Sequence, residues 1–127
     1  MSENKKKILL VDDDTISSEV ATIVLEEQYA VTTTQSGQAA LDLLTHNYKP
    51  DLILLDIIMP DLNGWETFNK IRGISLLHSV PIAFLTSLTA FEGKEQAEKL
   101  GAADYITKPF DNLDLLERVS KMVSITS

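Results

Sequence analysis

Short apolar runs alternate along this chain with longer segments that have helical spacing. Five runs are strand candidates: KILLV (7–11), AVTTT (30–34), DLILLDI (51–57), PIAFLT (81–86) and DYIT (104–107). The central runs are apolar at nearly every position, which is typical of strands covered on both faces in a parallel sheet. Repeated strand–helix units of this kind predict an α/β fold, with a parallel sheet between layers of helices.

The segments between the strands predict helices with apolar stripes. These stripes are Ile16, Val20, Ile23 and Val24 in the first helix, Ala40, Leu43 and Leu44 in the second, Phe68 and Ile71 in the third, and Leu113, Leu116 and Val119 in the last. Ser36 is placed to cap the second helix, and Gly101 to end the fourth. Five strand–helix units account for the chain, so we expect a single domain over residues 1–127 with no output domain.

Composition and charge narrow the class of protein. Hydrophobic residues make up 44% and charged residues 24% of the 127 residues, close to the globular average. A net charge of −8 argues against direct binding of nucleic acid, and the absence of cysteine excludes disulfides and cysteine metal ligands. No apolar stretch approaches the roughly 18 residues of a membrane span, and residues 1–7 lack the apolar core of a signal peptide. We therefore expect a soluble cytoplasmic protein.

Polar side chains follow four of the predicted strands. They are Asp12, Asp13 and Asp14 after the first strand, Asp56 in the third, Thr86 and Ser87 at the fourth, and Lys108 after the fifth. Ligands of an open parallel sheet bind at the carboxyl ends of its strands, near the point where strand order reverses. Clustered carboxylates disfavour one another's ionised forms unless a cation lies among them. An oxygen-only cluster with a lysine suits Mg²⁺ and phosphate oxygens.

Some of these residues have simpler roles. Asp14 directly precedes the first helix, so we predict that it is the N-cap of that helix. Asp56 lies inside the apolar stretch LILLDIIMP, where an unpaired carboxylate would be costly, and a role in a site is therefore favoured. His46 and His78 flank predicted loops, and we expect both to be exposed.

Four motifs occur in one order along the chain: LLVDD with Asp12 and Asp13, LLDIIMPDLNG with Asp56, FLTS with Thr86, and DYITKPF with Lys108. In these motifs the sequence resembles the receiver domain of two-component response regulators, including the stand-alone chemotaxis type, over essentially its whole length. The resemblance implies a flavodoxin-like (βα)5 fold. Its doubly wound, five-stranded parallel sheet would have the strand order 2-1-3-4-5, with helices on both faces.

The resemblance also implies roles for the residues at the sheet edge. Asp56 would be the phospho-acceptor, attacking a phosphohistidine of a sensor histidine kinase or histidine phosphotransfer protein, or a small donor such as acetyl phosphate. Asp13, Asp56 and the backbone carbonyl of Ile58 would hold Mg²⁺, or Mn²⁺ in its place, with Asp12 acting through a bound water. Lys108 would pair with a phosphoryl oxygen.

A conformational switch is implied in the same way. Thr86 would donate its hydroxyl to the phosphoryl group only after phosphorylation, and Tyr105 would then turn inward into the vacated space. Ser87 is small and would leave a path for the donor. The peptide bond between Lys108 and Pro109 would be cis.

The surface of the fourth helix, fifth strand and fifth helix is where relatives dock partners or dimerise. The resemblance implies this surface as the place for a phosphorylation-dependent homodimer or for a downstream target that the sequence does not identify. Lys94 and Asp114 are candidates for an ion pair across such a dimer, and the alternative is that both are solvated helix charges. Ile58 and Leu88 offer no acid, base or amide to orient water, so we expect slow self-dephosphorylation.

Two other functions use parts of the same pattern. A haloacid-dehalogenase-type phosphatase also has an aspartate nucleophile and Mg²⁺ after a first strand. Here Asp12 and Asp14 fit that motif, but Ile16 stands where Thr or Val is needed, and Asp56 would have no purpose. A flavin-binding module would need a phosphate loop rich in Thr and Ser where this chain has three aspartates. We therefore expect a phospho-acceptor without turnover rather than either alternative.

Overall fold

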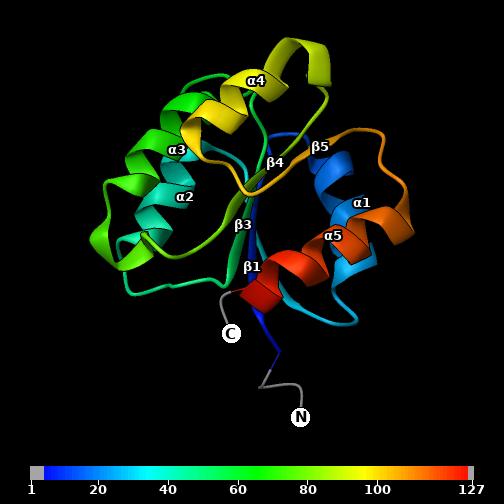
Figure 1. Cartoon of the computed structure of the whole chain (residues 1–127). Helices are drawn as coiled ribbons and strands as arrows, with labels where there is room; N and C mark the ends of the chain where they lie inside the picture. Colours follow the sequence, from blue (N-terminus) through cyan, green and yellow to red (C-terminus); the bar gives the residue numbers. More distant parts are fainter. Residues whose placement is uncertain (1–4, 126–127) are drawn as a thin grey trace.

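A five-stranded parallel sheet forms the centre of the molecule in the computed structural model, which describes residues 5–125 (Figure 1). The elements are β1 (Lys7–Val11), α1 (Thr15–Leu25), β2 (Ala30–Thr34), α2 (Gly37–Leu44), β3 (Leu52–Leu55), α3 (Gly64–Arg72), the short 3-10 helix η2 (Ser75–Leu77), β4 (Ile82–Thr86), α4 (Ala90–Leu100), β5 (Tyr105–Thr107) and α5 (Asn112–Ile125). The strand order β2-β1-β3-β4-β5 confirms the predicted fold. Residues 1–4, part of the segment considered for a signal peptide, lie outside the described residues.

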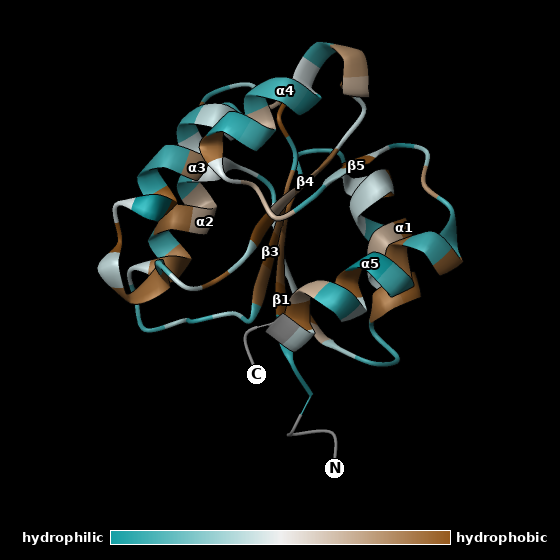
Figure 2. Cartoon of the chain, viewed as in Figure 1, coloured by the Kyte–Doolittle hydropathy of each residue, from teal (hydrophilic) through white to brown (hydrophobic). Residues whose placement is uncertain are grey.

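The central strands are buried on both faces, as their sequences predict. Every residue of β3 and β4 is buried, and the strands form the most hydrophobic layer of the molecule (Figure 2). Val11 of β1 pairs with Leu55 of β3, which in turn pairs with Phe84 of β4. The three strands therefore end at one edge of the sheet, where β4 runs on beyond Phe84 to Thr86, and the residues that follow them share that edge.

Helices cover both faces of the sheet (Figure 1). On one face α2, α3 and α4 contribute Ala40, Phe68, Ile71 and Ala97 to a core with Phe84. On the other face α1 and α5 pack Leu25 and Val119 against the sheet. Burial of a large apolar side chain contributes about 1.5–3 kcal/mol, so these two cores stabilise the fold. No helix within residues 5–125 is both long and apolar enough to cross a membrane.

The predicted buried stripe of α1 is wrong at three of its four positions, and Val24 alone is partly buried against the core. Ile16, Val20 and Ile23 are 74%, 47% and 66% exposed. The residues that face the sheet are Ser18, Ala21 and Leu25. Both sets have helical spacing, and the small side chains of Ser18 and Ala21 let the helix axis approach the sheet closely. Periodicity alone does not choose between two such faces, because the rotation of the helix is set by the short loop that leads into it.

The last helix shows the same kind of difference. Leu113 is 77% exposed rather than buried, and Leu116 lies at the margin of the core. Val119 is buried as predicted. Leu115, Met122 and Val123 are also buried in α5.

The predicted helix ends are confirmed. The Ser36 hydroxyl accepts the backbone N–H of Ala39 at 3.0 Å, and the Asp14 carboxylate accepts those of Ile16 and Ser17. Gly101 ends α4 with φ of 88°, a conformation that glycine adopts without steric cost. His46 and His78 are exposed, as expected.

Candidate functional site

Three carboxylates meet where β1 and β3 end. Asp12 and Asp13 directly follow β1, and Asp56 directly follows β3, so the pairing of these strands brings the three residues together. Each offers a carboxylate oxygen to a cluster whose ligand atoms lie within 4.8 Å of one another. Asp12 and Asp56 are buried, at 1% and 5% exposed, whereas Asp13 is open to solvent. The structure therefore brings together the acidic residues that the sequence singled out.

Backbone hydrogen bonds fix the two buried aspartates. The Asp56 N–H donates to the Val11 carbonyl at 2.9 Å, and the Asp12 N–H donates to the Thr34 carbonyl at 3.0 Å. One carboxylate oxygen of Asp56 accepts the N–H of Ile57 at 2.7 Å. The strand ladders thus continue into the site, and both carboxylates are held on rigid backbone.

Lys108 reaches this cluster from β5. Its Nζ lies 2.5 Å from Oδ2 of Asp12 and 3.5 Å from Oδ2 of Asp56. The Lys108 N–H donates to the Thr86 carbonyl at 2.8 Å, which anchors the lysine beside the end of β4. The Lys108–Pro109 peptide is cis. One ammonium group thus contacts both buried carboxylates.

Burial dominates the electrostatics of Asp56. Desolvation raises the pKa of its carboxyl above the ordinary value, and the nearby charge of Asp12 raises it further. A hydrogen bond from Thr86, the charge of Lys108 and the N–H of Ile57 lower the same pKa without restoring it. The cluster holds two buried carboxylates and an exposed one but only one ammonium group, so negative charge is in excess. A divalent cation that binds oxygen would supply the missing positive charge and suits the carboxylate ligands.

Thr86 ends β4 and is fully buried. Its Oγ1 accepts the N–H of Leu88 at 3.2 Å, so the hydroxyl proton is left for Asp56. The first turn after β4 therefore orients this hydroxyl toward the cluster. Ser87, the next residue, is exposed beside it.

Tyr105 lies inward from β5 and is 8% exposed. Its hydroxyl donates to the carbonyls of Leu88 at 2.9 Å and Thr89 at 3.2 Å, and its ring centroid is 6.3 Å from that of Phe84. Burial raises the pKa of the Tyr105 hydroxyl. The ring is thus connected to the β4–α4 loop that begins directly after Thr86.

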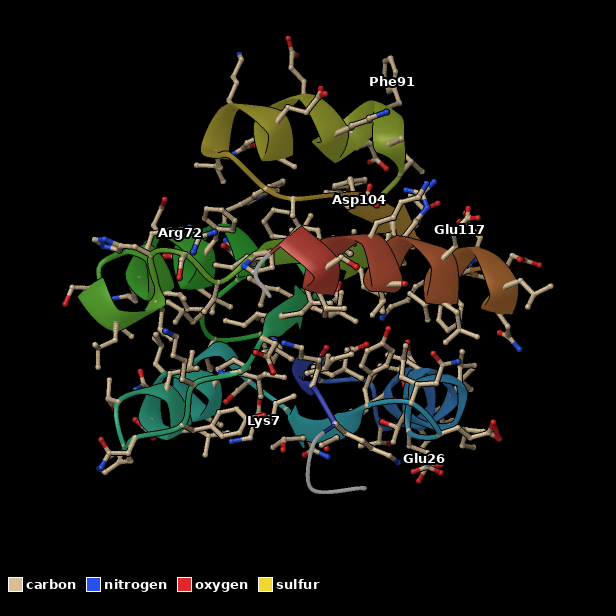
Figure 3. The ribbon with its side chains drawn as sticks, turned by 60° about the horizontal axis from the view of Figure 1, so that its bottom comes forward. Lys7, Glu26, Arg72, Phe91, Asp104 and Glu117 are labelled. Carbon is tan, nitrogen blue, oxygen red and sulfur yellow. The ribbon has the colours of Figure 1, made fainter. Side chains whose placement is uncertain are left out.

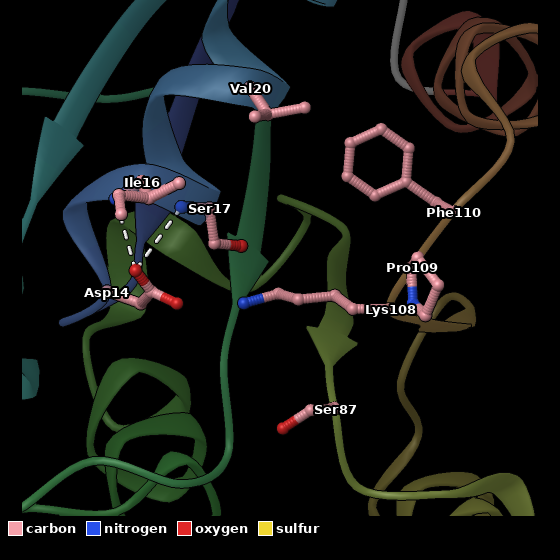
Figure 4. Close-up of a pocket in the computed structure, with 8 residues that line it drawn as sticks. All are labelled: Asp14, Ile16, Ser17, Val20, Ser87, Lys108, Pro109 and Phe110. Carbon is pink, nitrogen blue, oxygen red and sulfur yellow. Dashed lines mark hydrogen bonds between the residues drawn. The ribbon is translucent and has the colours of Figure 1, made fainter.

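An apolar cavity of about 420 Å³ opens beside Lys108 (Figure 4), whose ammonium contacts the acidic cluster. In Figure 4, Val20 and Phe110 lie on one side of the Lys108 side chain and Ser87 lies on the other. The other lining residues are Asp14, Ile16, Ser17 and Pro109. Sequence reasoning missed this cavity because it assigned Ile16 and Val20 to the core.

Sequence reasoning also missed the role of Gly64. It begins α3 and donates its N–H to the Ile57 carbonyl at 2.8 Å. A Cβ at this position would lie 2.3 Å from the Asp56 carbonyl oxygen and 2.6 Å from the Ile57 Cα. The absence of a side chain therefore lets α3 rest directly on the loop that carries Asp56. Ile58 lies in that loop with its side chain 56% exposed, and its carbonyl stays a predicted metal ligand.

Known proteins share this sequence and architecture. The family model of the response regulator receiver domain matches residues 8–120. A probable cyclic di-GMP phosphodiesterase of Vibrio cholerae is 38% identical over 85 residues, which cover 67% of this chain and 19% of that protein. The response regulator SaeR of Staphylococcus aureus is 36% identical over 98 residues, covering 77% of this chain and 41% of that protein. The aligned part is thus less than half of either relative.

Solved structures of similar proteins cover nearly the whole chain. The Francisella response regulator 1452 receiver domain has a TM-score of 0.86 at 31% identity, covering 97% of this chain and 100% of that one. The chemotaxis response regulator CheY4 of Vibrio cholerae has a TM-score of 0.84 at 29% identity, covering 94% and 99%. None of these similarities supports the phosphatase alternative.

Proposed function

Because the chain belongs to the response regulator receiver domain family, we propose that Asp56 accepts a phosphoryl group from a sensor histidine kinase or a histidine phosphotransfer protein. One observation carries this proposal: the Asp56 carboxylate lies among those of Asp12 and Asp13, with the Lys108 ammonium 3.5 Å from its Oδ2. Phosphoryl transfer depends on positioning and charge neutralisation more than on covalent help from the protein. This cluster can supply both.

In the transfer step a carboxylate oxygen of Asp56 attacks phosphorus. The new O–P bond replaces the P–N bond of the donor phosphohistidine, whose electron pair returns to the imidazole. Lys108 neutralises one phosphoryl oxygen, and the Thr86 hydroxyl donates to another. Ser87 is exposed and small, so the donor can approach beside it. Burial raises the pKa of the Asp56 carboxyl above its ordinary value, and the positive charges of Lys108 and of a bound cation would favour the ionised, nucleophilic carboxylate.

Asp13, Asp56 and the carbonyl of Ile58 would hold Mg²⁺, or Mn²⁺ in its place, with Asp12 acting through a bound water. The cation would neutralise charge on the phosphoryl oxygens during transfer. Asp13 suits this role because its carboxylate belongs to the cluster and is open to solvent.

The lifetime of the aspartyl phosphate follows from its neighbours. Ile58 is exposed beside the acceptor, and Leu88 is half-buried in the loop after Thr86. Neither side chain can orient or activate a water molecule. We therefore propose that the protein holds its phosphoryl group rather than turning it over, and that each acceptor is labelled once.

The donor would dock over α1. Ile16, Val20 and Ile23 are exposed there, and the first two also line the cavity next to Lys108 and Ser87. Exposed apolar side chains gathered beside a reaction centre are typical of protein-binding surfaces. An apolar helix of the donor could cover them while presenting its histidine to Asp56.

The output surface would be the face of α4, β5 and α5, where a phosphorylation-dependent homodimer or an unidentified target would bind. Figure 3 labels Phe91 on α4, Glu117 on α5 and Asp104 directly before β5, and Phe91 is 99% exposed. Arg118 pairs with Asp104 and with Asp114, each at 2.9 Å. A pair between Lys94 of one copy and Asp114 of another would therefore compete with an ion pair inside the chain.

The decisive measurement is intact mass after incubation with acetyl phosphate and Mg²⁺. We expect one added phosphoryl group, lost when EDTA is present and absent from Asp56→Asn. A phosphorylated histidine kinase serves as the second donor. Failure of both donors to label the natural protein would overturn the proposal.

The phosphatase alternative predicts a different result in the same incubation. Repeated hydrolysis of a phosphomonoester, with no stoichiometric adduct on Asp56, would support that function instead. A single label that persists after the donor is removed would exclude it.

A further inference from the structure

Gly93 occupies an unfavourable place for a glycine. It lies in the first turn of α4 and is buried. Glycine is among the weakest helix formers and alanine is the strongest, so a helix interior ordinarily favours alanine. Among the described residues only Gly101 is a glycine with positive φ, so Gly93 is not required by its backbone conformation. Space, rather than backbone freedom, explains this residue.

The space is filled by Tyr105. A Cβ at Gly93 would lie 2.4 Å from the Tyr105 hydroxyl oxygen and 3.1 Å from Cζ of the same ring. It would also lie 3.0 Å from a methyl carbon of Leu88. An alanine therefore forces the ring to move, since contacts of this length are not tolerated. Tyr105 is the only ring among the atoms nearest to Gly93.

The position of Tyr105 is coupled to the reaction centre through hydrogen bonds. Its hydroxyl donates to the carbonyls of Leu88 and Thr89. The N–H of Leu88 in turn donates to the Thr86 hydroxyl oxygen at 3.2 Å. Thr86 is fully buried at the end of β4, so a displaced Tyr105 would release the loop whose N–H holds the Thr86 hydroxyl oxygen.

We propose that Gly93 is a positioning residue: its missing side chain seats the Tyr105 hydroxyl beneath α4, and the seated ring holds the β4–α4 loop so that Thr86 faces Asp56. The inference rests on the proposed phosphoryl acceptance by Asp56 and adds a determinant for its rate. It also makes the start of α4, an exposed part of the output face, sensitive to the volume of residue 93.

Gly93→Ala tests the proposal, with Gly73→Ala as the matched control. A Cβ at Gly73 would lie 3.3 Å from the Lys70 carbonyl oxygen and has no ring nearby. Labelling with 3-fluorotyrosine places a fluorine reporter on each of the three tyrosines. The resonance that is missing from Tyr105→Phe is the resonance of Tyr105. The difference between its ¹⁹F shifts in H₂O and D₂O measures the exposure of the ring. We expect a buried ring in the natural protein and in Gly73→Ala, and an exposed ring in Gly93→Ala.

The rate of labelling by acetyl phosphate gives the second readout. We expect Gly93→Ala to slow it about two- to tenfold, the factor that one ordinary hydrogen bond represents. Tyr105→Phe should slow it by a similar factor, and the double variant by no more than either single change, because both act through one contact. A glycine that matters only for helix packing would show additive effects.

Three results would overturn the inference: an exposed Tyr105 in the natural protein, a Gly93→Ala variant with a buried ring and an unchanged rate, or additivity in the double variant. If Gly93→Ala does not fold, an unchanged rate in Tyr105→Phe overturns it. If the natural protein accepts no phosphoryl group from any donor, the proposed function fails. The fluorine measurement then still decides whether Gly93 seats Tyr105.

Discussion

Replacing Gly64 by alanine tests whether the acceptor loop is held by direct backbone contact with α3. The added Cβ would lie 2.3 Å from the Asp56 carbonyl oxygen and 2.6 Å from the Ile57 Cα. An ordinary contact at this position begins at 3.4 Å, so the loop and the helix must separate by about 1 Å. Both neighbours are backbone atoms, and no side-chain rotation relieves the overlap.

A displacement of about 1 Å at a reacting group slows catalysis on the order of 100-fold. We therefore expect Gly64→Ala to label with acetyl phosphate about 100-fold more slowly than the natural protein, when both are folded and Mg²⁺ is saturating. The assay is a time course of intact mass, with thermal denaturation as the check on folding. Gly73→Ala, at the other end of the same helix, should label at the natural rate.

The result that would refute this reasoning is a folded Gly64→Ala protein that labels at the natural rate. Such a protein would have moved α3 rather than the acceptor loop, so Gly64 would serve packing alone. A loss of stability without a loss of rate would carry the same meaning. Slow labelling in Gly73→Ala would show that any change in α3 disturbs the site.

Four further changes probe the charges and surfaces of the site. Asp56→Asn should raise the melting temperature of the metal-free protein at pH 7, because burial and Asp12 penalise the ionised carboxylate; this gain should disappear below the ordinary pKa of 3.8, where the folded and unfolded carboxyls are both protonated. At ten times its dissociation constant Mg²⁺ should stabilise the natural protein by about 1.4 kcal/mol, and Asp56→Asn by much less, as measured by calorimetry. Lys108→Ala should destabilise the metal-free protein by up to about 3 kcal/mol in urea denaturation, since it leaves two buried carboxylates unopposed, and Mg²⁺ should recover part of the loss. The aspartyl phosphate should outlast a few seconds after removal of the donor, and Leu88→Glu should shorten its lifetime; a natural half-life of seconds would contradict the role given to Leu88. Ile16→Lys should slow transfer from a phosphorylated kinase while leaving labelling by acetyl phosphate unchanged, and equal slowing with both donors would place the effect in the site rather than at the docking surface.

The sequence predicts the site better than it predicts the helix faces, for a physical reason. A residue that directly follows a buried parallel strand has its place fixed by the sheet. The proximity of Asp12 and Asp56 therefore follows from the strand pattern of the sequence. A helix can rotate about its axis, and α1 has apolar residues on more than one side. Ile16 and Val20 were therefore assigned to the core, although they line the cavity beside Lys108. The largest side chains identify a core-facing stripe only when the opposite face is polar.

Close contacts that are possible only because a residue has no side chain could not be predicted from the sequence. Gly64 and Gly93 each look like an ordinary glycine near the start of a helix, and their neighbours in space lie on strands or loops outside that helix. Their importance follows from distances to Asp56 and Tyr105, which a pattern of hydrophobic and polar letters does not contain. Gly101 was predictable because its role at a helix end is local.

The three aspartates after β1 are crowded, but only Asp12 among them is buried. It lies beside the buried Asp56, which follows β3, and the ammonium of Lys108 contacts both carboxylates, so the fold tolerates this pair. The balance of charge is incomplete once Asp13 is included, because the cluster holds three carboxylates and the Lys108 ammonium contacts only two of them. A site with a residual deficit of positive charge attracts a divalent cation, and one that was fully neutralised by the protein would not. Adding a second cation to the protein, for example by Ser87→Lys, should therefore stabilise the metal-free chain and weaken Mg²⁺ binding, as measured by calorimetry. Stabilisation with undiminished Mg²⁺ affinity would show that the cation is held by geometry alone.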